Sequence, residues 1–216
     1  MKRKLLAVIL MGGLLLSATG CGKQESTESG KDNKKTEQKE SVATIDDNAS
    51  YFVILNGTKY SVGDKISDMS NVGLKQDERE LDQEINKNTY LIGGGYLKNS
   101  EGKGVLSVTA YNDTDSKITV KDAKIGAVKM GTYDYDKLSD AEKSVNAEFV
   151  GGIKLGSSLE DIVKVFGETT DVYESESLGY KKYTYKSKEV YRKFEFSIDK
   201  NGKLSEIYFQ NLVYNK

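Results

Sequence analysis

The residue types that most often perform chemistry in proteins are scarce in this 216-residue chain. It has no histidine and a single cysteine, Cys21. Without histidine, a Ser-His-Asp or Cys-His nucleophile system and a histidine-containing zinc site are excluded. A lone cysteine can form no disulfide within the chain. Carboxylates, lysines and hydroxyls are the reactive groups that are left.

Carboxylates are plentiful, with 33 Asp and Glu residues, so a pair acting as general acid and base is chemically conceivable. A hydrolase of that kind would need a deep pocket that holds two facing carboxylates. The adjacent Glu160 and Asp161 stand at the start of an expected helix, where the positive helix end explains them. We therefore expect no catalysis, no metal site and no cofactor.

Two further motifs have a chemical and a structural interpretation. Gly93-Gly94-Gly95 could cradle a phosphate, but it lacks a following Lys-Ser/Thr and has β-type neighbours, which favours a bulge or tight hairpin. The stretch Asn112–Ser116 could suggest calcium, but it lacks EF-hand spacing, which favours a plain turn.

The segment before Cys21 has the composition of a secretory signal. Three cations, Lys2, Arg3 and Lys4, precede an apolar run over 5–16, and small residues lead to the cysteine. The apolar run is shorter than the roughly 20 residues that span a bilayer. Residues 1–20 are therefore predicted to be a cleaved signal peptide. A plain secreted protein with an incidental cysteine is the alternative.

The four residues Ala18-Thr19-Gly20-Cys21 resemble the lipobox of bacterial lipoproteins, with Ala18 in place of the usual leucine. The resemblance implies a diacylglyceryl thioether on Cys21 and cleavage before it. Two acyl chains give stable anchoring. The resemblance thus predicts a protein anchored at the outer, extracytoplasmic face of the cell membrane. The type of cell envelope stays open.

Residues 21–49 are predicted to be a disordered linker. They are almost wholly charged or small and polar, so they cannot bury enough apolar surface to offset the entropy of ordering. A flexible chain of this length reaches about 30 Å. Without the three cations of the signal, the chain carries a small negative charge, and no basic field indicates a nucleic-acid partner.

Beyond the linker, the pattern predicts a first α+β module over 50–130. The segments 51–55 and 58–62 flank Asn56-Gly57, which is typical of a β-hairpin with a type I′ turn. Further strands are expected near 89–97, 104–112 and 118–129. A connector over 131–147 follows, with a short helix near 140–145 after the capping box that begins at Ser139.

A second α+β module is predicted over 148–216. Ser158 is expected to cap a helix whose apolar residues have helical spacing, and Gly167 is expected to end it in the left-handed conformation. Antiparallel strands follow. Phe194, Phe196 and Ile198 share one strand face, and a turn over 199–202 leads into a last strand over 204–212.

The two modules have a short common pattern at a constant offset of 93 residues. In both, an apolar residue and a glycine precede an apolar–x–Asp–apolar helix segment, which predicts a sharp turn and an amphipathic helix on a sheet. Internal duplication is the favoured interpretation, and a chance match is the alternative. The paired residues are Val62 and Leu155, Gly63 and Gly156, Ile66 and Leu159, Asp68 and Asp161, Met69 and Ile162, and Val72 and Val165.

The second module resembles the beta-lactamase-inhibitor-protein-like fold and the related small outer-membrane lipoprotein module of the SmpA/OmlA type. The resemblance lies in 152–174, 194–199 and 203–209, and Thr169 stands where the family pattern has proline. It implies an α+β tandem of two modules, each with a short helix packed on an antiparallel sheet of about four strands, which could share one broad sheet. It implies no activity. The matching positions are Gly152, Ile153, Gly156, Ser157, Val163 and Gly167.

Four tyrosines of the second module are the candidate partner-binding residues: Tyr173, Tyr183, Tyr185 and Tyr208. One helix covers only one face of a four-stranded sheet, and tyrosine suits a half-wet face. Ordinary cross-strand packing is the alternative. We expect a lipid-anchored cell-surface protein that binds a protein or an envelope polymer without catalysis. The alternative function is inhibition of a secreted or envelope enzyme, such as a β-lactamase or a wall hydrolase.

Overall fold

The computed structural model describes residues 45–189 and 191–212, which lie in one compact unit. The predicted signal peptide, Cys21 and the linker up to residue 44 lie outside the described residues. Residues 45–49, which the sequence assigned to the linker, belong to the folded unit. There Asp47 caps the short 3-10 helix η1 (Asn48–Ser50) by accepting a hydrogen bond from the Ala49 amide.

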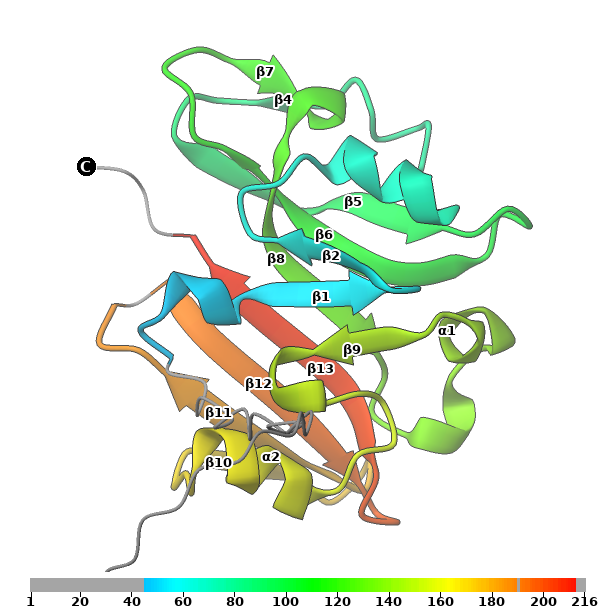
Figure 1. Ribbon diagram of the computed structural model, residues 1–216, viewed down its shortest axis with the longest axis vertical. Coiled ribbons are helices and arrows are strands. Elements are labelled where there is room, and N and C mark those ends of the chain that lie inside the picture. Colours follow the sequence, from blue (N-terminus) through cyan, green and yellow to red (C-terminus); the bar gives the residue numbers. More distant parts are fainter. Residues whose placement is uncertain (1–44, 190, 213–216) are drawn as a thin grey trace, which may run out of the picture. The chain divides into compact units, whose positions relative to one another are not determined.

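An antiparallel sheet of eight strands dominates the fold (Figure 1). Its strands follow the order β10-β11-β12-β13-β8-β6-β5-β3, so that the last strand of the chain pairs with β8 in the middle of the sheet. The bounds are β3 (Lys75–Gln76), β5 (Thr89–Lys98), β6 (Gly104–Asn112), β8 (Lys124–Gly131), β10 (Val172–Ser175), β11 (Tyr180–Lys186), β12 (Arg192–Asp199) and β13 (Leu204–Asn211).

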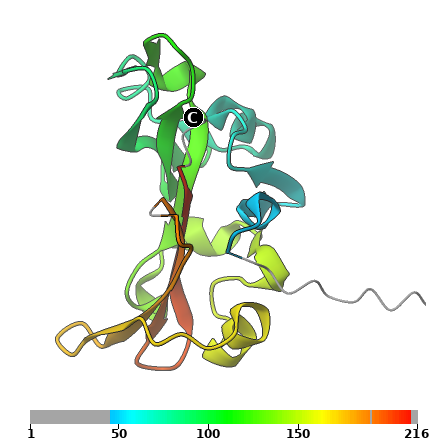
Figure 2. The same ribbon diagram turned by 90° about the vertical axis from the view of Figure 1, so that its left-hand side faces the viewer.

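A second layer lies on one side of this sheet (Figure 2). It contains the small antiparallel sheet β2 (Thr58–Ser61), β1 (Phe52–Leu55) and β9 (Ala147–Phe149), the 3-10 helix η2 (Ile66–Val72) and the helix α2 (Leu159–Phe166). The remaining elements are β4 (Glu84–Ile85), which pairs with β7 (Ile118–Thr119), and η3 (Val120–Asp122), η4 (Tyr135–Lys137), α1 (Asp140–Ser144) and η5 (Val150–Gly152). None of the helices in the described part of the chain could span a bilayer.

The predicted hairpin is confirmed. β1 and β2 pair in register from Leu55 with Thr58, and the two turn residues have the positive φ angles that a type I′ turn requires, 49° at Asn56 and 87° at Gly57. The predicted strand over 104–112 is also confirmed as β6. The single strand expected over 118–129 is wrong, because η3 separates β7 from β8.

The hydrophobic core lies between the two layers. Tyr51 stacks on Phe194 with ring centroids 4.6 Å apart, and Phe149 meets Phe209 edge-on at 6.0 Å. All four side chains are at most 1% exposed. Tyr51 directly precedes β1, and Phe149 is the last residue of β9, whereas Phe194 and Phe209 lie on β12 and β13. These rings therefore join the small sheet to the large one.

Helix α2 forms where the sequence predicted it. The Ser158 hydroxyl accepts the Asp161 amide proton, and the Asp161 carboxylate accepts the Ser158 amide proton in return, so the capping box is complete. Its apolar side packs Phe166 on Phe194 and Phe196 at 4.8 and 5.2 Å. Gly167 has a positive φ of 78° but a ψ of −170°, so the predicted left-handed cap is wrong and the chain leaves the helix extended.

Each half of the large sheet contains the same backbone arrangement. The Gly63 amide donates to the Ile125 carbonyl at 2.9 Å, and the Ile125 amide donates to Asp64 at 2.8 Å. Ninety-three residues later, Gly156 and Ser157 make the same two bonds with Leu204, at 2.7 and 2.8 Å. Ile125 and Leu204 lie at the starts of β8 and β13, which pair with each other. The overall class is α+β with mainly antiparallel sheet.

Candidate functional site

The side of the large sheet opposite the second layer is the candidate functional site, and we call it the open face (Figure 2). Strand alternation assigns its residues, because their sequence neighbours Leu97, Met130, Ile207 and Phe196 point into the core. The side chains of the open face include Tyr90, Tyr96, Ser107, Thr109, Lys129, Tyr173, Lys182, Thr184, Lys193, Glu195, Glu206, Tyr208 and Gln210.

One row of this face crosses six strands in direct register. It consists of Thr184, Glu195, Tyr208, Lys129, Ser107 and Tyr96. Tyr208 stands near the middle of the row, half-buried, and its hydroxyl donates to the Gln210 side-chain oxygen. The Lys193 ammonium lies 5.1 Å from the centre of the Tyr208 ring. The row thus places an ordered aromatic side chain at the centre of the sheet.

The charged groups of the open face are paired with one another. Lys129 bonds Glu206 at 2.8 Å, and Lys193 bonds Glu195 at the same distance. Lys182 also approaches Glu195, at 3.8 Å. Burial raises the pKa of Tyr208 to about 12, and the Glu195 carboxylate adds to the rise. The hydroxyl is therefore protonated at neutral pH and acts as a hydrogen-bond donor.

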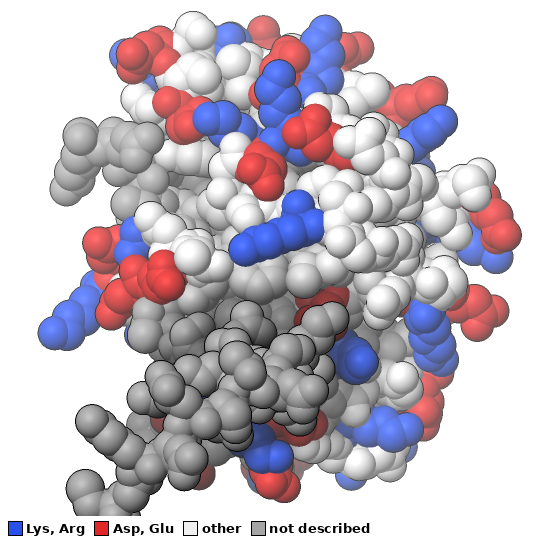
Figure 3. Space-filling model, in the orientation of Figure 1, with Lys and Arg blue, Asp and Glu red and all other residues white. Residues whose placement is uncertain are grey.

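Large exposed apolar and aromatic side chains lie toward both edges of this same sheet and on its loops. In the described residues there are seven: Tyr90, Ile92, Tyr96, Val172, Tyr173, Leu178 and Tyr191. Three lie on β5, two on β10, and two in the loops that connect β10, β11 and β12. The second layer contributes none of them. In Figure 3, which views that second layer, positive and negative side chains are interspersed around the periphery of the described surface, and the middle is mainly uncharged.

Two of the four predicted tyrosines lie on the open face. Tyr173 is 59% exposed, and its ring centroid lies 6.3 Å from that of Tyr180, which in turn lies 6.5 Å from Tyr133. Tyr208 holds the central position described above. These two residues are therefore accessible from the side that the second layer leaves uncovered.

The other two predicted tyrosines are placed wrongly by the sequence argument. Tyr185 is 4% exposed, its ring packs 5.1 Å from Phe166, and its hydroxyl donates to the Gly167 carbonyl at 3.0 Å. Tyr183 shares this core side of β11 and packs partly buried against the core. Both pair with inward-facing phenylalanines of β12, so neither belongs to the open face.

Sequence reasoning missed the tyrosines of the first half. Tyr90 and Tyr96 alternate with the inward-facing Leu91 and Leu97, and this alternation was present in the predicted strand over 89–97. The expected bulge at the three glycines is confirmed by a register shift between Leu91 and Gly95. It pushes Ile92 outward until 78% of it is exposed. This alternation is the sequence signal that indicates Tyr90 and Tyr96 as residues of the open face.

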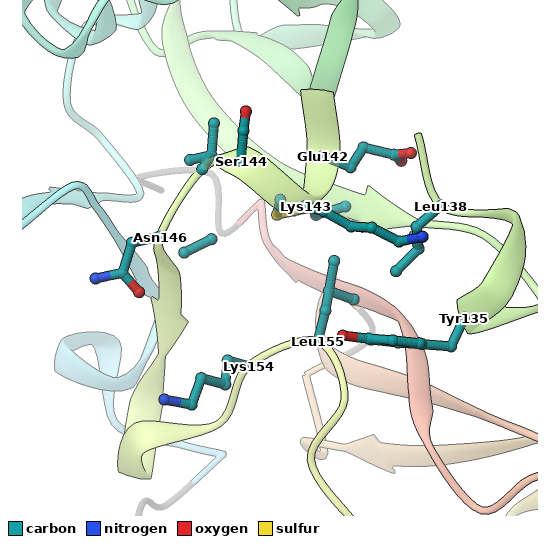
Figure 4. Close-up of a pocket in the computed structure, with 11 residues that line it drawn as sticks. Tyr135, Leu138, Glu142, Lys143, Ser144, Asn146, Lys154 and Leu155 are labelled. Carbon is teal, nitrogen blue, oxygen red and sulfur yellow. The ribbon is translucent and has the colours of Figure 1, made fainter. Parts of the chain in front are cut away.

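A cavity of about 260 Å³ opens on the other side, beside α1 (Figure 4). Glu142 is the carboxylate among its described lining residues, and it accepts hydrogen bonds from the Ser139 amide and hydroxyl, each at 2.8 Å. Lys143 lies 6.0 Å from the Tyr135 ring centre. Two facing carboxylates, which a hydrolase of the type considered above would need, are thus not found in this cavity as described.

A second cavity, of about 360 Å³, lies at the β10–β11 hairpin. Its buried acid, Asp199, accepts hydrogen bonds from the backbone amides of Asn201 and Lys203 and so organises the turn before β13. No group of three or more possible metal-ligating side chains occurs within the residues that the structure describes. We therefore take the open face, with its ordered row of side chains across six strands, as the candidate functional site in preference to the two cavities.

Comparison with protein-family models, with curated proteins and with solved structures finds no match to this chain. The family resemblance in 152–174 and 194–209 therefore stays a prediction. The geometry of the open face and the signal sequence are the features of this chain that indicate a function.

Proposed function

We propose that this protein is a lipid-anchored binding protein at the extracytoplasmic face of the cell membrane, and that its open face contacts a protein or an envelope polymer without catalysis. One observation carries the proposal: all seven exposed large apolar or aromatic side chains of the described residues belong to the large sheet and its loops, and three of them, Tyr90, Tyr96 and Tyr173, lie on the open face. Exposed aromatic side chains on one face are typical of interaction surfaces.

The open face is suited to being covered by a partner. Tyrosine offers a large rigid contact area and loses little conformational entropy, and it keeps a hydrogen-bonding tip. The ion pairs Lys129–Glu206 and Lys193–Glu195 are already formed, so a partner that covers them does not bury isolated charges. A partner of low net charge fits this arrangement.

The start of the folded unit leaves the open face free. Ile45 packs against the core, and its carbonyl accepts a hydrogen bond from the Tyr51 hydroxyl at 2.7 Å. The Arg192 guanidinium donates to the Asp46 carbonyl at 3.1 Å. The segment η1 that follows lies on the side of the second layer (Figure 2). The described part of the chain therefore begins on the side away from the open face.

The tandem organisation is also part of the proposal. The matching hydrogen bonds of Gly63 and Gly156, at 93 residues' separation, support an internal duplication. The order of strands supports it as well, since β13 and β8 meet at the centre and each half continues outward from them. This arrangement, two halves in one broad sheet, is the one that the resemblance to a beta-lactamase-inhibitor-protein-like tandem implies.

Partner capture tests the binding proposal. The full chain, solubilised in mild detergent, is immobilised and exposed to membrane and envelope extracts of the source cells. We expect a retained component that the Tyr96→Ala/Tyr208→Ala variant loses. The matched control is Phe52→Ala, a half-buried aromatic on β1 in the other layer. Equal retention by both variants would contradict the role of the open face.

Anchoring is tested separately. We expect the wild-type chain to incorporate labelled palmitate and to fractionate with membranes, and Cys21→Ser to lose the label. A membrane-bound, unlabelled wild-type chain would overturn the lipoprotein assignment.

Enzyme inhibition is the second candidate function, favoured by the β10–β11 hairpin. Figure 2 shows this hairpin leaning out on the side of the open face, and its loop residue Leu178 is 49% exposed. A projecting apolar loop could enter the cleft of an enzyme. Adding the full chain to a panel of β-lactamases and wall hydrolases tests this function. We expect an inhibited enzyme to be released by Leu178→Asp, and activity of every enzyme at micromolar protein would eliminate the idea.

A further inference from the structure

Strand β10 is an outer strand of the large sheet, four residues long, and it lacks some of the usual protections of sheet edges. It pairs with β11 on one side, and every residue from Thr170 to Glu174 is exposed. Proteins commonly protect edge strands with lysine, proline, a bulge or short length. β3, at the opposite edge, has only two residues, and β2, at the edge of the small sheet, carries Lys59. β10 contains neither lysine nor proline.

The backbone of β10 directs some of its N–H and C=O groups away from β11. The Thr184 amide donates to the Asp171 carbonyl at 2.9 Å, and the Gly179 amide donates to Ser175 at 2.8 Å. Because antiparallel pairs alternate, the odd-numbered residues of this segment direct their N–H and C=O groups toward β11. Val172 and Glu174 therefore direct theirs outward, in the geometry that an added strand would meet.

The acidic side chains along this edge favour a positively charged binding partner. The segment 168–176 contains four acids, Glu168, Asp171, Glu174 and Glu176, and no basic residue. Asp171 and Glu174 contact Lys186 and Lys181 of β11, but all four of these side chains are at least half exposed. Ion pairs of this kind are weak and exchange readily for others. Val172 and Tyr173, 42% and 59% exposed, supply apolar contact on the two faces.

A second copy of this chain fits the edge poorly. Two β10 strands paired antiparallel about a two-fold axis would bring Asp171 and Glu174 of one copy close to the same acids of the other. Like charges opposite one another destabilise a strand pair. Charge complementarity instead favours an extended segment that carries lysine or arginine.

We propose that β10 accepts an extended, lysine- or arginine-bearing peptide segment of a partner protein as a ninth strand of the sheet. Its main-chain groups pair with Val172 and Glu174, and its cations meet Asp171 and Glu174. This site is separate from the row of six residues that contains Tyr96 and Tyr208.

The probe is the fluorescein-labelled peptide acetyl-Lys-Thr-Val-Lys-Thr-Val-Lys-amide, titrated with the full detergent-solubilised chain by fluorescence anisotropy. We expect saturable binding that weakens as salt increases. Val172→Pro should weaken it about tenfold, because proline removes the outward N–H without touching the ladder to β11. Val172→Thr, which keeps that N–H, is the matched control and should bind as the wild type does.

The variant Asp171→Asn/Glu174→Gln tests the role of charge, and we expect it to bind the peptide several-fold more weakly. The control is Glu101→Gln, which changes an exposed acid in the distant β5–β6 hairpin and should leave peptide binding unchanged. Circular dichroism and thermal unfolding check that each variant is folded.

A peptide N-methylated at alternate residues should not bind. Equal binding by the methylated peptide, equal binding by Val172→Pro, or self-association of the wild type that Val172→Pro abolishes would each overturn the proposal. Since Tyr96→Ala/Tyr208→Ala should leave peptide binding intact, failure here is distinct from failure of the proposed function.

Discussion

Tyr185 and Tyr208 have opposite environments although both lie within strands of the same sheet. Tyr185 faces α2 and is buried, whereas Tyr208 faces away from the second layer and is half-buried. The side of the strand on which each stands decides the difference, because successive residues of a strand alternate between the faces. The residue type alone carries no such information.

Removing the Tyr185 hydroxyl should destabilise the fold slightly. In Tyr185→Phe the Gly167 carbonyl loses its hydrogen bond of 3.0 Å, and we expect a decrease of about 1 kcal/mol in the free energy of unfolding. Urea denaturation of the full chain measures it. Tyr96→Phe, at an exposed position, is the control. Equal stability of the two variants would mean that the bond contributes nothing.

Asp77 should make stability depend on pH in the acid range. Hydrogen bonds from Arg79 and Lys98 hold the pKa of this carboxylate well below its usual range. A lowered folded-state pKa stabilises the fold above the unfolded-state value of about 3.9, and this contribution is lost as the pH falls toward the folded-state value. We expect the melting temperature of the wild type to fall more steeply below pH 4 than that of Asp77→Asn. Parallel curves for the two proteins would exclude this role.

At the scale of elements, local sequence signals explain the helices and turns well. The capping box at Ser139 and the N-cap at Ser158 form as expected, and Ser158 forms a complete capping box with Asp161 as well, because each needs only residues three positions apart. The bulge at Gly93–Gly95 depends on glycine, because Gly93 has a positive φ of 73° and a Cβ at Gly95 would stand 2.3 Å from the Val108 side chain. Helix η2 differs from α2 in being a 3-10 helix, although the two share a sequence pattern.

Loss of the α2 cap should be measurable. Ser158→Ala removes the acceptor for the Asp161 amide, and we expect a loss of about 1 kcal/mol of stability. Ser158→Asn keeps an N-cap acceptor and should recover most of the loss. Chemical denaturation monitored by far-ultraviolet circular dichroism checks both. A full loss in Ser158→Asn would point to a cause other than capping.

At the scale of the whole molecule, one strand pair joins the two halves. β13 and β8 pair from Glu206 with Gly131 to Gln210 with Ala127, so residues about 80 apart in sequence form the centre of the sheet. Of the core rings, Tyr51 precedes both halves of the sheet, Phe149 lies between them, and Phe194 and Phe209 belong to the second half. Buried residues of the first half, such as Leu106 and Val128, belong to the same hydrophobic core. The halves therefore share one core.

A shared core predicts a single cooperative transition. We expect Phe209→Ala to lower the free energy of unfolding by about 3–5 kcal/mol, the usual cost of deleting a buried phenylalanine ring. Amide hydrogen exchange should show protection falling in β6 and β8 as well as in β11 and β12. Loss confined to β11–β13 would indicate that the halves unfold independently.

The sequence by itself determined the α+β class, the hairpin at Asn56-Gly57, α1, α2 and most strand positions, since these depend on residues close together in the chain. It also carries the signal for lipidation at Cys21, which stays a prediction. It located the tyrosines but assigned Tyr183 and Tyr185 to the wrong side, because a strand's alternation does not say which face another layer will cover. Only the tertiary structure decided that. By pairing β8 with β13 it merged two halves into one sheet, covered one face with the second layer, and left Tyr96, Tyr173 and Tyr208 on the other.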